Sequence, residues 1–322
     1  MKILFVTSEC APFSKSGGLA DVAFSLPPAL KQAGDNIEII VPYYKMTRDR
    51  FEDEITFVKK CSCQLGDRTI EYGLCRGQLN GVTVWFIEHE HFFHRPRLYG
   101  YGDDSLRFAF FCRAVIDAMP HLNFQPDVVH CHDWQTGMIP ALLKIQYAHY
   151  PFYQDMKTVY TIHNLQYQGV FPIKAVQDTL GLGDSLFTSD KLECFGCANF
   201  MKAALVYADV ITTVSPSYAE EITTAYYGER LDGLIRARHD SLYGVLNGID
   251  VEEYNPETDP LIAHNYTKES LETKVDNKLA LQKELGLEVN PDIPLIAMVG
   301  RLSNQKGLDL VDCVLGDIMN EN

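Results

Sequence analysis

Lys15, Gly17 and Gly18 lie in a short segment, residues 15–19 (KSGGL), that has the composition of an anion-binding loop. Adjacent glycines permit positive φ angles and let backbone N–H groups approach a ligand closely. The N-terminus of the helix expected after them favours a phosphate, and Lys15 adds a point charge. The segment matches neither a Walker loop nor G-x-G-x-x-G. It therefore indicates either a phosphate site or an ordinary glycine turn between a strand and a helix.

Polar side chains also follow two apolar, strand-like runs further along the chain. Residues 130–134 (HCHDW) end one run, and residues 162–164 (IHN) end the next. Adjacent strand residues point to opposite faces, so residues 130–133 cannot all bind one metal ion. His132 and Asp133 either line a crevice at the carboxyl ends of parallel strands or belong to a packed strand end. His163 and Asn164 fall at the same sheet edge, as a structural pair or as part of a site.

Two cations, Arg301 and Lys306, lie in a glycine-bounded loop, residues 300–307 (GRLSNQKG), near the end of the sequence. Such a loop at the carboxyl end of a strand is suited to an anion. Asn247 lies in another motif, residues 246–250 (LNGID). Cys194 and Cys197 have the spacing of half a zinc site or of a redox motif, but the sequence holds no second CxxC, so we expect ordinary thiols.

The elements that must position these residues alternate between short β-branched runs and helical patterns. This alternation is typical of an α/β fold with a parallel sheet and helices on both faces. The expected strands are Lys2–Thr7, Ile37–Val41, Thr83–Ile87, Asp127–Cys131, Thr158–Ile162, Val210–Val214 and Pro294–Val299. The expected helices are Ala20–Gln32, Leu106–Met119, Thr136–Tyr147, Phe200–Tyr207 and Tyr218–Ala225. Ser215 followed by Pro216 reads as the cap and first residue of the last helix.

The pattern changes near residue 250. Residues 251–290 are rich in charge and contain one expected helix, Leu271–Leu285. A fresh apolar run and a helix follow; the apolar face of that helix is Val311, Val314, Leu315, Ile318 and Met319. One strand and one helix cannot enclose a core. We therefore expect a complete Rossmann-like domain over 1–250, a linker with a helix over 251–290, and the start of a second domain over 291–322.

The composition limits the classes of partner. The chain has 322 residues, 28 Lys and Arg against 43 Asp and Glu, and a net charge of −15. Such an acidic protein is poorly suited to nucleic acid or an anionic membrane. No run approaches the ~18 apolar residues of a membrane helix, and the apolar start is too short for a secretory leader. We expect a cytoplasmic protein whose nine cysteines are free, buried thiols.

The order and spacing of these motifs resemble those of bacterial glycogen synthases and plant starch synthases, the retaining glucosyltransferases of family 5. The matching residues are 15–22, 98–100, 107–111, 132–134, 162–164, 213–216, 246–250 and 300–307. The resemblance covers essentially the whole chain. It implies a GT-B fold, with the active site between two Rossmann-like domains. It also implies ADP-glucose as donor, an α-1,4-glucan such as a glycogen or starch primer as acceptor, and no metal or other cofactor, because protein cations stabilise the departing ADP.

The resemblance further implies a role for each candidate residue. His163 is expected against the transferred glucose, with Arg301 and Lys306 neutralising the leaving diphosphate; these three are the expected catalytic residues. The expected substrate-binding residues are Lys15, Gly17, Gly18, Asp133, Asn164 and Asn247. In this family, retention of configuration is described as same-face attack by the 4-hydroxyl of the acceptor.

Family members continue for a further ~150 residues, about one domain. We therefore expect a truncated member that carries the acceptor-side domain and only the start of the donor-side domain. The leading prediction is the glucosyl transfer of the family. One alternative is a catalytically incompetent remnant that binds glucan or nucleotide sugar and pairs with a separate chain bearing the missing half. Another is a GT-B glycosyltransferase with a different sugar nucleotide.

Overall fold

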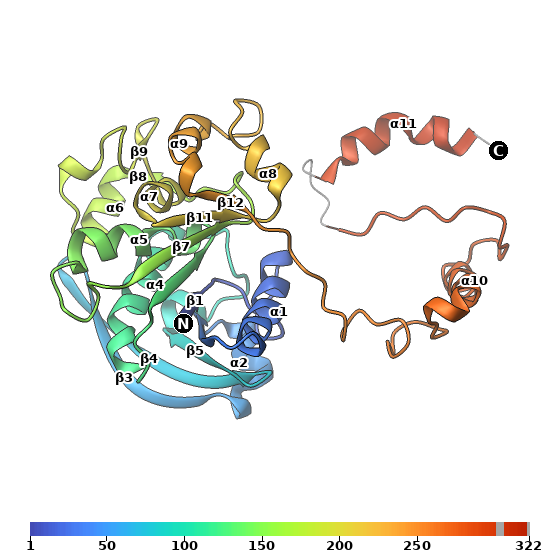
Figure 1. Cartoon of the computed structure of the whole chain (residues 1–322), viewed down its shortest axis with the longest axis horizontal. Helices are drawn as coiled ribbons and strands as arrows, with labels where there is room; N and C mark the ends of the chain where they lie inside the picture. The colour runs from blue at the N-terminus through green and yellow to red at the C-terminus, as the bar shows by residue number, and fades with distance from the viewer. Residues whose placement is uncertain (301–305, 321–322) are drawn as a thin grey trace. The chain divides into compact units, whose positions relative to one another are not determined.

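The computed structural model describes residues 1–300 and 306–320. Their contacts divide the chain into two units, Met1–Gly248 and Ile249–Asn322. The first unit is built on a nine-stranded sheet (Figure 1) with strand order β12-β11-β7-β6-β1-β2-β5-β4-β3. The strands are β1 (Lys2–Val6), β2 (Asn36–Pro42), β3 (Thr56–Leu65), β4 (Arg68–Leu79), β5 (Val82–Glu88), β6 (Val128–His132), β7 (Lys157–Ile162), β11 (Val210–Thr213) and β12 (Leu242–Gly244).

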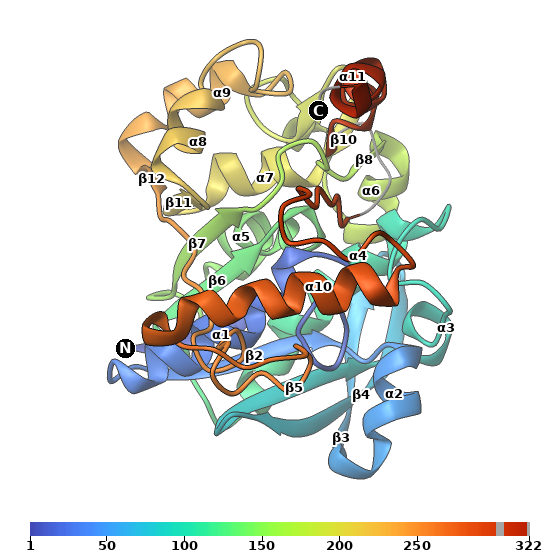
Figure 2. The ribbon, with the colours of Figure 1, turned by 90° about the vertical axis from the view of Figure 1, so that its right-hand side faces the viewer.

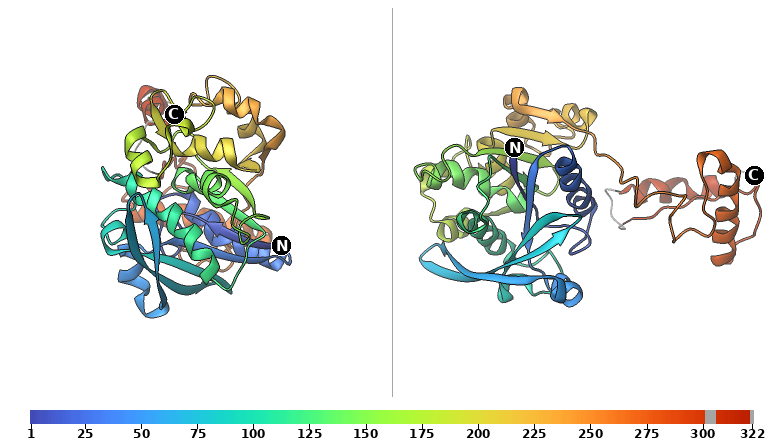
Figure 3. Two further views of the ribbon diagram at one scale, coloured as in Figure 1. Left: turned by 90° about the vertical axis from the view of Figure 1, so that its left-hand side faces the viewer. Right: turned by 60° about the horizontal axis from the view of Figure 1, so that its bottom comes forward.

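Parallel pairing runs from β12 across the sheet to β5. The predicted parallel sheet is confirmed, and each strand expected within the first 250 residues lies within one residue of its predicted ends. Sequence reasoning missed the antiparallel hairpin of β3 and β4, which continues the sheet beyond β5 (Figure 3). It also missed β12, a three-residue strand at the opposite edge. Both lie at edges, where a strand lacks the continuous apolar run of a buried parallel strand.

Strand side chains alternate between two cores, one on each face of the sheet. Leu4 and Ile40 belong to the larger core, whereas Phe5 and Ile39 belong to the smaller one. The larger core is completed by α4 (Asp104–Ala118), α5 (Met138–Leu142) and α7 (Phe200–Tyr207), and the smaller one by α1 (Gly18–Gln32); Figure 2 labels these helices. Helices therefore cover both faces, as predicted. The helices of this unit are α1 (Gly18–Gln32), α2 (Lys45–Phe51), α3 (Glu90–Phe93), α4 (Asp104–Ala118), α5 (Met138–Leu142), α6 (Ile173–Leu180), α7 (Phe200–Tyr207), α8 (Pro216–Glu221) and α9 (Asp232–Ala237).

The helix predicted over Thr136–Tyr147 is irregular. A 3-10 turn (Trp134–Thr136) precedes α5, and a π-helical turn (Leu143–Tyr147) follows it. The cap predicted for α8 is confirmed, because the Ser215 hydroxyl accepts a 2.9 Å hydrogen bond from Tyr218 N. This helix is shorter than predicted and ends at Glu221.

A second, three-stranded sheet contains β8 (Val170–Pro172), β10 (Cys197–Asn199) and β9 (Glu193–Cys194) in that order. Strands β9 and β10 form a β-hairpin in which Cys194 and Cys197 are paired next to the turn. The turn consists of Phe195 with φ 51° and Gly196 with φ 80°. All nine cysteines are free, as predicted, but the prediction that all of them are buried is wrong. Six are buried, whereas Cys194 and Cys197 are half-buried and Cys313 is exposed.

The second unit contains α10 (Lys274–Glu284), preceded by a 3-10 segment (Lys268–Thr273), and α11 (Leu308–Asn320). The strand predicted over Pro294–Val299 is wrong, since these residues have no regular structure. A strand needs a neighbour for its backbone hydrogen bonds, and the described part of this unit offers none. The predicted apolar face of α11 is present, and no residue of that helix is buried. Within the described residues, no helix is both long and apolar enough to cross a membrane.

Candidate active site

The candidate residues of the first unit gather at one edge of the large sheet. The strand order reverses at β1: the next strand in the sequence, β2, pairs with β1 on one side, and the later strand β6 pairs with it on the other side. Open α/β sheets bind ligands outside the carboxyl ends of the strands at such a reversal of strand order. Glu9 follows β1, Asp133 follows β6, and His163 follows β7. The predicted juxtaposition of these strand ends is therefore confirmed.

Glu9, which sequence reasoning missed, organises the glycine segment. Its side chain is buried, and Oε2 accepts hydrogen bonds from the backbone N–H groups of Ser16 (2.6 Å) and Gly17 (3.0 Å). Oε1 accepts from the hydroxyls of Ser16 (2.7 Å) and Tyr99 (2.8 Å). Glu9 thus occupies the backbone N–H groups of Ser16 and Gly17. The next backbone N–H group along the chain, that of Gly18 at the N-terminus of α1, is the one that an incoming anion can use.

Neither glycine is required by the fold itself. Gly17 has an extended backbone (φ −157°), and Gly18 begins α1, so the positive φ angles that the sequence suggested are not present. A Cβ atom built on either residue meets nothing within 4 Å. An ordinary turn would require glycine only if the backbone had a positive φ angle or if a side chain had no room. Neither condition holds at these two positions, so the turn alone does not explain the two glycines. Open space above both residues is what close approach of a ligand requires.

Lys15 lies at the entrance of this segment and is half exposed. Its Nζ is 2.5 Å from Oδ1 of Asp21 in the first turn of α1. An exposed pair of this kind is worth little, typically ~0.2–1 kcal/mol, so the ammonium can exchange partners at low cost. The negative net charge of the chain opposes binding of an anion. Any anion at this edge must therefore be held by local groups such as Lys15 and the N-terminus of α1.

Asp133 joins the ends of β6 and β7. Its Oδ1 accepts hydrogen bonds from the backbone N–H groups of His163 (2.8 Å) and Asn164 (3.3 Å). The residue has φ 54° and ψ −178°, a region that a non-glycine residue adopts only under constraint. Burial raises the pKa of its carboxyl to about 7. Asp133 therefore fixes the turn that presents His163 and Asn164.

Behind His163 lies a row of buried histidine rings. His163 Nε2 is 2.9 Å from His132 Nδ1, and His130 Nε2 is 2.7 Å from the Thr161 hydroxyl. Burial lowers the pKa of His163 to about 4 and that of His130 to about 3. These rings are consequently neutral at pH 7. Among residues 1–300 and 306–320, no three His, Cys, Asp or Glu side chains are arranged to hold a metal ion.

A pocket of about 370 Å³ is lined by Tyr101, Asp104, Trp134 and residues 166–171. The Trp134 ring is partly buried against Phe108 and Phe171, with ring centroids 5.0 and 5.6 Å away. The Trp134 ring therefore packs against the core on one side and borders the pocket on the other. An aromatic wall with nearby polar side chains suits a ligand that has both apolar faces and hydroxyl groups.

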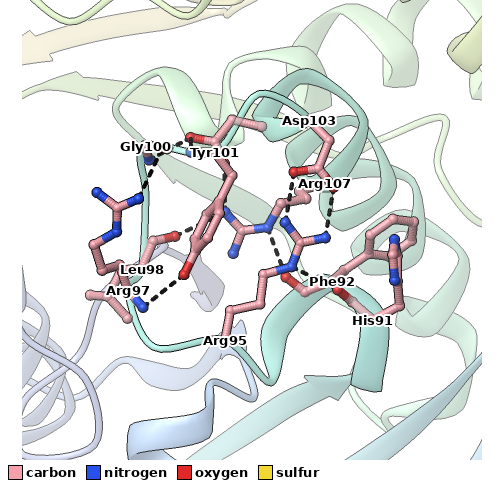
Figure 4. A network of polar contacts seen from close by, with 10 residues as sticks. His91, Phe92, Arg95, Arg97, Leu98, Gly100, Tyr101, Asp103 and Arg107 are labelled. Atoms are coloured by element: carbon pink, nitrogen blue, oxygen red, sulfur yellow. Dashed lines mark hydrogen bonds and ion pairs between the residues drawn. The ribbon is translucent and has the colours of Figure 1, made fainter.

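The loop before α4 is held by a buried ion pair (Figure 4). Arg107 is fully buried and donates to Asp104 Oδ1 (2.5 Å) and to the carbonyls of Phe92 (2.7 Å) and Leu98 (3.1 Å). Asp104 Oδ2 accepts from the N–H groups of Gly100 (2.8 Å) and Tyr101 (3.2 Å). This loop carries Tyr99, whose hydroxyl reaches Glu9. The ion pair thus supports the glycine segment from a distance.

Asn247, the remaining predicted residue of the first unit, is not brought to this cluster. Asn247 follows β12 at the outer edge of the sheet; it is exposed, and no hydrogen bond between described residues links it to Asp133 or His163. Lys306 is exposed in the second unit. Arg301 lies outside the described residues.

The parallel sheet, its strand-end crevice and its helical layers define a domain of the GT-B glycosyltransferase class. Residues 2–237 match the family model of the starch synthase catalytic domain. The chain belongs to this family, as the resemblance predicted.

Glycogen synthase from Geobacillus thermodenitrificans is 53% identical to the chain over 322 residues, and that from Anoxybacillus flavithermus is 50% identical. A solved structure, the catalytic domain of starch synthase IV from Arabidopsis thaliana bound to ADP and acarbose, superposes with a TM-score of 0.89 at 31% identity. It matches 99% of this chain and 66% of that one. The chain covers 66% of the length of both glycogen synthases.

Proposed function

We propose that this protein transfers glucose from ADP-glucose to the non-reducing end of an α-1,4-glucan with retention of configuration. The observation that carries the proposal is the end-to-end match to glycogen synthases at 53% identity. The ADP in the Arabidopsis relative supports a nucleotide-sugar donor. In domain terms, we propose that residues 1–250 form the acceptor-side domain, 251–290 a linker, and 291–322 the start of the donor-side domain. The cytoplasm stays the predicted compartment.

In the proposed reaction, the bond between glucose C1 and the diphosphate oxygen breaks. A bond from the acceptor 4-hydroxyl forms on the same face, and the hydroxyl proton leaves with the diphosphate. Negative charge therefore grows on the leaving group. Lys15 and the Gly18 amide would stabilise that charge from the N-terminus of α1, because donors fixed in advance need no rearrangement during the reaction. Arg301 and Lys306 are proposed to complete this set of charges from the second unit.

The sugar is proposed to lie over His163 and Asn164, whose backbone Asp133 holds in place. Gly17 and Gly18 leave the space for the donor, and Asn247 is proposed as a further polar contact. The pocket beside Trp134 is a candidate location for the acceptor glucan, since a pyranose ring packs its C–H face on an aromatic ring and uses its hydroxyls elsewhere. None of these proposed roles requires a metal ion, because the cations named here supply the positive charge.

The test uses the chain fused to the remaining third of a glycogen synthase homologue. Incorporation of labelled glucose into glycogen is measured with ADP-glucose and, in parallel, with UDP-glucose and GDP-glucose. We expect transfer from ADP-glucose, release of the label by an α-1,4-specific glucanase, and strong loss of activity in His163→Ala. Preference for another nucleotide would favour the alternative glycosyltransferase. No transfer from any donor by a folded fusion would refute the proposal.

A second candidate function is that the chain binds glucan or nucleotide sugar and acts only together with a separate polypeptide. We expect poor transfer by the chain alone and restored transfer when the homologue's remaining third is added as a separate protein. Turnover by the chain alone within the usual enzyme range of ~1–1,000 per second would exclude this candidate.

A further inference from the structure

His132 lies behind His163 and has no part in the proposed reaction as described so far. Its side chain is fully buried, and its Nδ1 is 2.9 Å from His163 Nε2. We propose that His132 is a positioning residue that donates from Nδ1 to His163 Nε2 and thereby places the single proton of His163 on Nδ1. The inference rests on the proposed function only where it places a sugar against His163; the assignment of the proton does not depend on it.

Both rings of this pair are neutral near pH 7. Burial lowers the pKa of His163 to about 4 and that of His132 well below its usual value, with the neighbouring histidines acting in the same direction on His132. A neutral imidazole has one N–H donor and one bare nitrogen acceptor. The short contact between the two rings therefore has two arrangements, in which either His132 or His163 is the donor.

The two arrangements differ in what they leave at His132 Nε2. This atom is buried and has no hydrogen-bond partner among the described residues. If His132 donates from Nδ1, its Nε2 is a bare acceptor. If His163 is the donor, the proton of His132 must lie on Nε2, as a buried N–H group without an acceptor. Orphaned buried N–H groups are rarer in native proteins than under-used acceptors, which favours His132 as the donor.

Neighbouring rings do not rescue the second arrangement. Phe5 and His130 are tilted against His132, with centroid distances of 3.9 and 4.1 Å and interplanar angles of 30° and 36°. The N–H bond of an imidazole lies in the plane of its ring. Rings this close to the centre of His132 lie over its face and off the line of an N–H bond at Nε2, so neither is placed to accept that bond with its π face.

The consequence at His163 is chemical. Its Nε2 is engaged by His132, and no hydrogen bond between described residues engages its Nδ1. With the proton on Nδ1, His163 presents an N–H donor to a ligand oxygen such as a sugar hydroxyl. It has no free lone pair there, so it does not act as a general base toward the acceptor.

The test is NMR spectroscopy of the whole chain, labelled with ¹⁵N in its histidine rings and recorded without substrate. Long-range proton–nitrogen correlations distinguish the protonated from the bare ring nitrogen, and His163→Asn identifies which signals belong to His163. We expect the proton of His163 on Nδ1 in the unmodified protein. A proton on Nε2 would overturn the inference, and this measurement requires no change at His132.

Variants then test whether His132 is the cause. In His132→Asn the side-chain amide can still donate to His163, so we expect the Nδ1–H form to persist. In His132→Leu the donor is lost, so we expect His163 to shift toward the Nε2–H form that free histidine prefers in water. His130→Asn is the matched control, because His130 packs against His132 but bonds to Thr161. An Nδ1–H form that survives His132→Leu, or an equal shift in His130→Asn, would refute the positioning role.

These spectra are independent of glucose transfer. If the Nδ1–H form is found and the fusion protein transfers no glucose, the proposed function fails while the role of His132 stands. If the fusion protein is active and His163 carries its proton on Nε2, only the inference about His132 fails.

Discussion

Replacing Arg107 with Met should destabilise the first unit more than the same change at Arg95, twelve residues away. Both arginines pair with an aspartate, and both guanidinium groups lie 4.9 Å from the centroid of the Tyr101 ring (Figure 4). Only the contact with Tyr101 cancels in the comparison, because Arg107 also lies 5.8 Å from the Phe93 ring centroid and 5.2 Å from that of Phe108. The pairs differ in burial, because Arg107 and Asp104 have side-chain exposures of 0% and 9%, whereas those of Arg95 and Asp103 are 16% and 33%.

Removing one partner of a buried ion pair leaves an uncompensated charge and costs about 3–5 kcal/mol. Arg107→Met also leaves the carbonyls of Phe92 and Leu98 without their donor, which adds to this cost. The Arg95–Asp103 pair is half-buried and bidentate, so Arg95→Met should cost more than the ~0.2–1 kcal/mol of an exposed pair but less than Arg107→Met. At roughly 2–4 °C per kcal/mol for a unit of this size, Arg107→Met should lower Tm by about 6–20 °C.

The assay is urea unfolding at pH 7 of the unmodified chain, Arg107→Met, Arg95→Met and the double variant Arg107→Met/Asp104→Asn. The double variant removes the orphaned charge and keeps an oxygen acceptor for Gly100 and Tyr101. It should therefore recover part of the stability that Arg107→Met loses. The reasoning would be refuted if the two single variants lost the same free energy of unfolding, or if the double variant recovered none.

Burial raises the pKa of Asp133 to about 7, so the folded state keeps a proton that the unfolded chain, with a pKa of ~3.9, has lost. The contribution of Asp133 to stability should therefore fall as the pH rises from about 4 to about 7, whereas the buried neutral rings of His130 and His163 make an opposite contribution over the same range. Asp133→Asn should consequently make stability rise more steeply with pH there than in the unmodified chain, and parallel curves would contradict this assignment. Gly17→Ala should leave Tm unchanged and weaken nucleotide-sugar binding in the fusion protein. Gly169→Ala should cost more than ~1 kcal/mol, because φ is +65° and the new Cβ would lie 2.4 Å from the Trp134 ring. Lys15→Gln should raise the KM for ADP-glucose roughly tenfold, as expected for a lost charge-assisted contact, and an unchanged KM would remove Lys15 from the donor site. EDTA should leave transfer intact, whereas activity regained on adding Mg²⁺ would indicate a metal-dependent donor site.

The parallel half of the sheet was predictable because strands such as β1 and β7 are buried on both faces and read as apolar runs. β3 was not, since only alternate residues of its carboxyl-terminal half are buried and its first five residues, which include Lys59 and Lys60, are all exposed. The run 294–299 has the same composition as the true strands. Composition does not reveal whether a neighbouring strand exists, so that prediction failed.

The sheet edge that gathers Asp133, His163 and Asn164 was predictable because parallel strands end at a common edge. Glu9 was missed, although its position directly after β1 in a polar turn was a signal. Its role depends on Tyr99, which approaches from a distant loop, and no local pattern shows that contact. The His132–His163 pair likewise depends on the register of β6 against β7, in which His132 lies opposite Thr161.

The central position of β1 has a consequence for synthesis on the ribosome. β1 is made first, and its neighbour β2 completes a pair by residue 42, but its other neighbour, β6, ends only at residue 132. Strands β1, β2, β5, β4 and β3, which are neighbours in that order, can form half of the sheet once β5 has emerged at residue 88. By then α1 already covers one face of this half-sheet. The opposite face, which includes Leu4 and Ile40, must wait for α4 to end at residue 118. At ~5–20 residues per second, that face stays open to solvent for a few seconds, long enough for a nascent chain to bind a chaperone or aggregate.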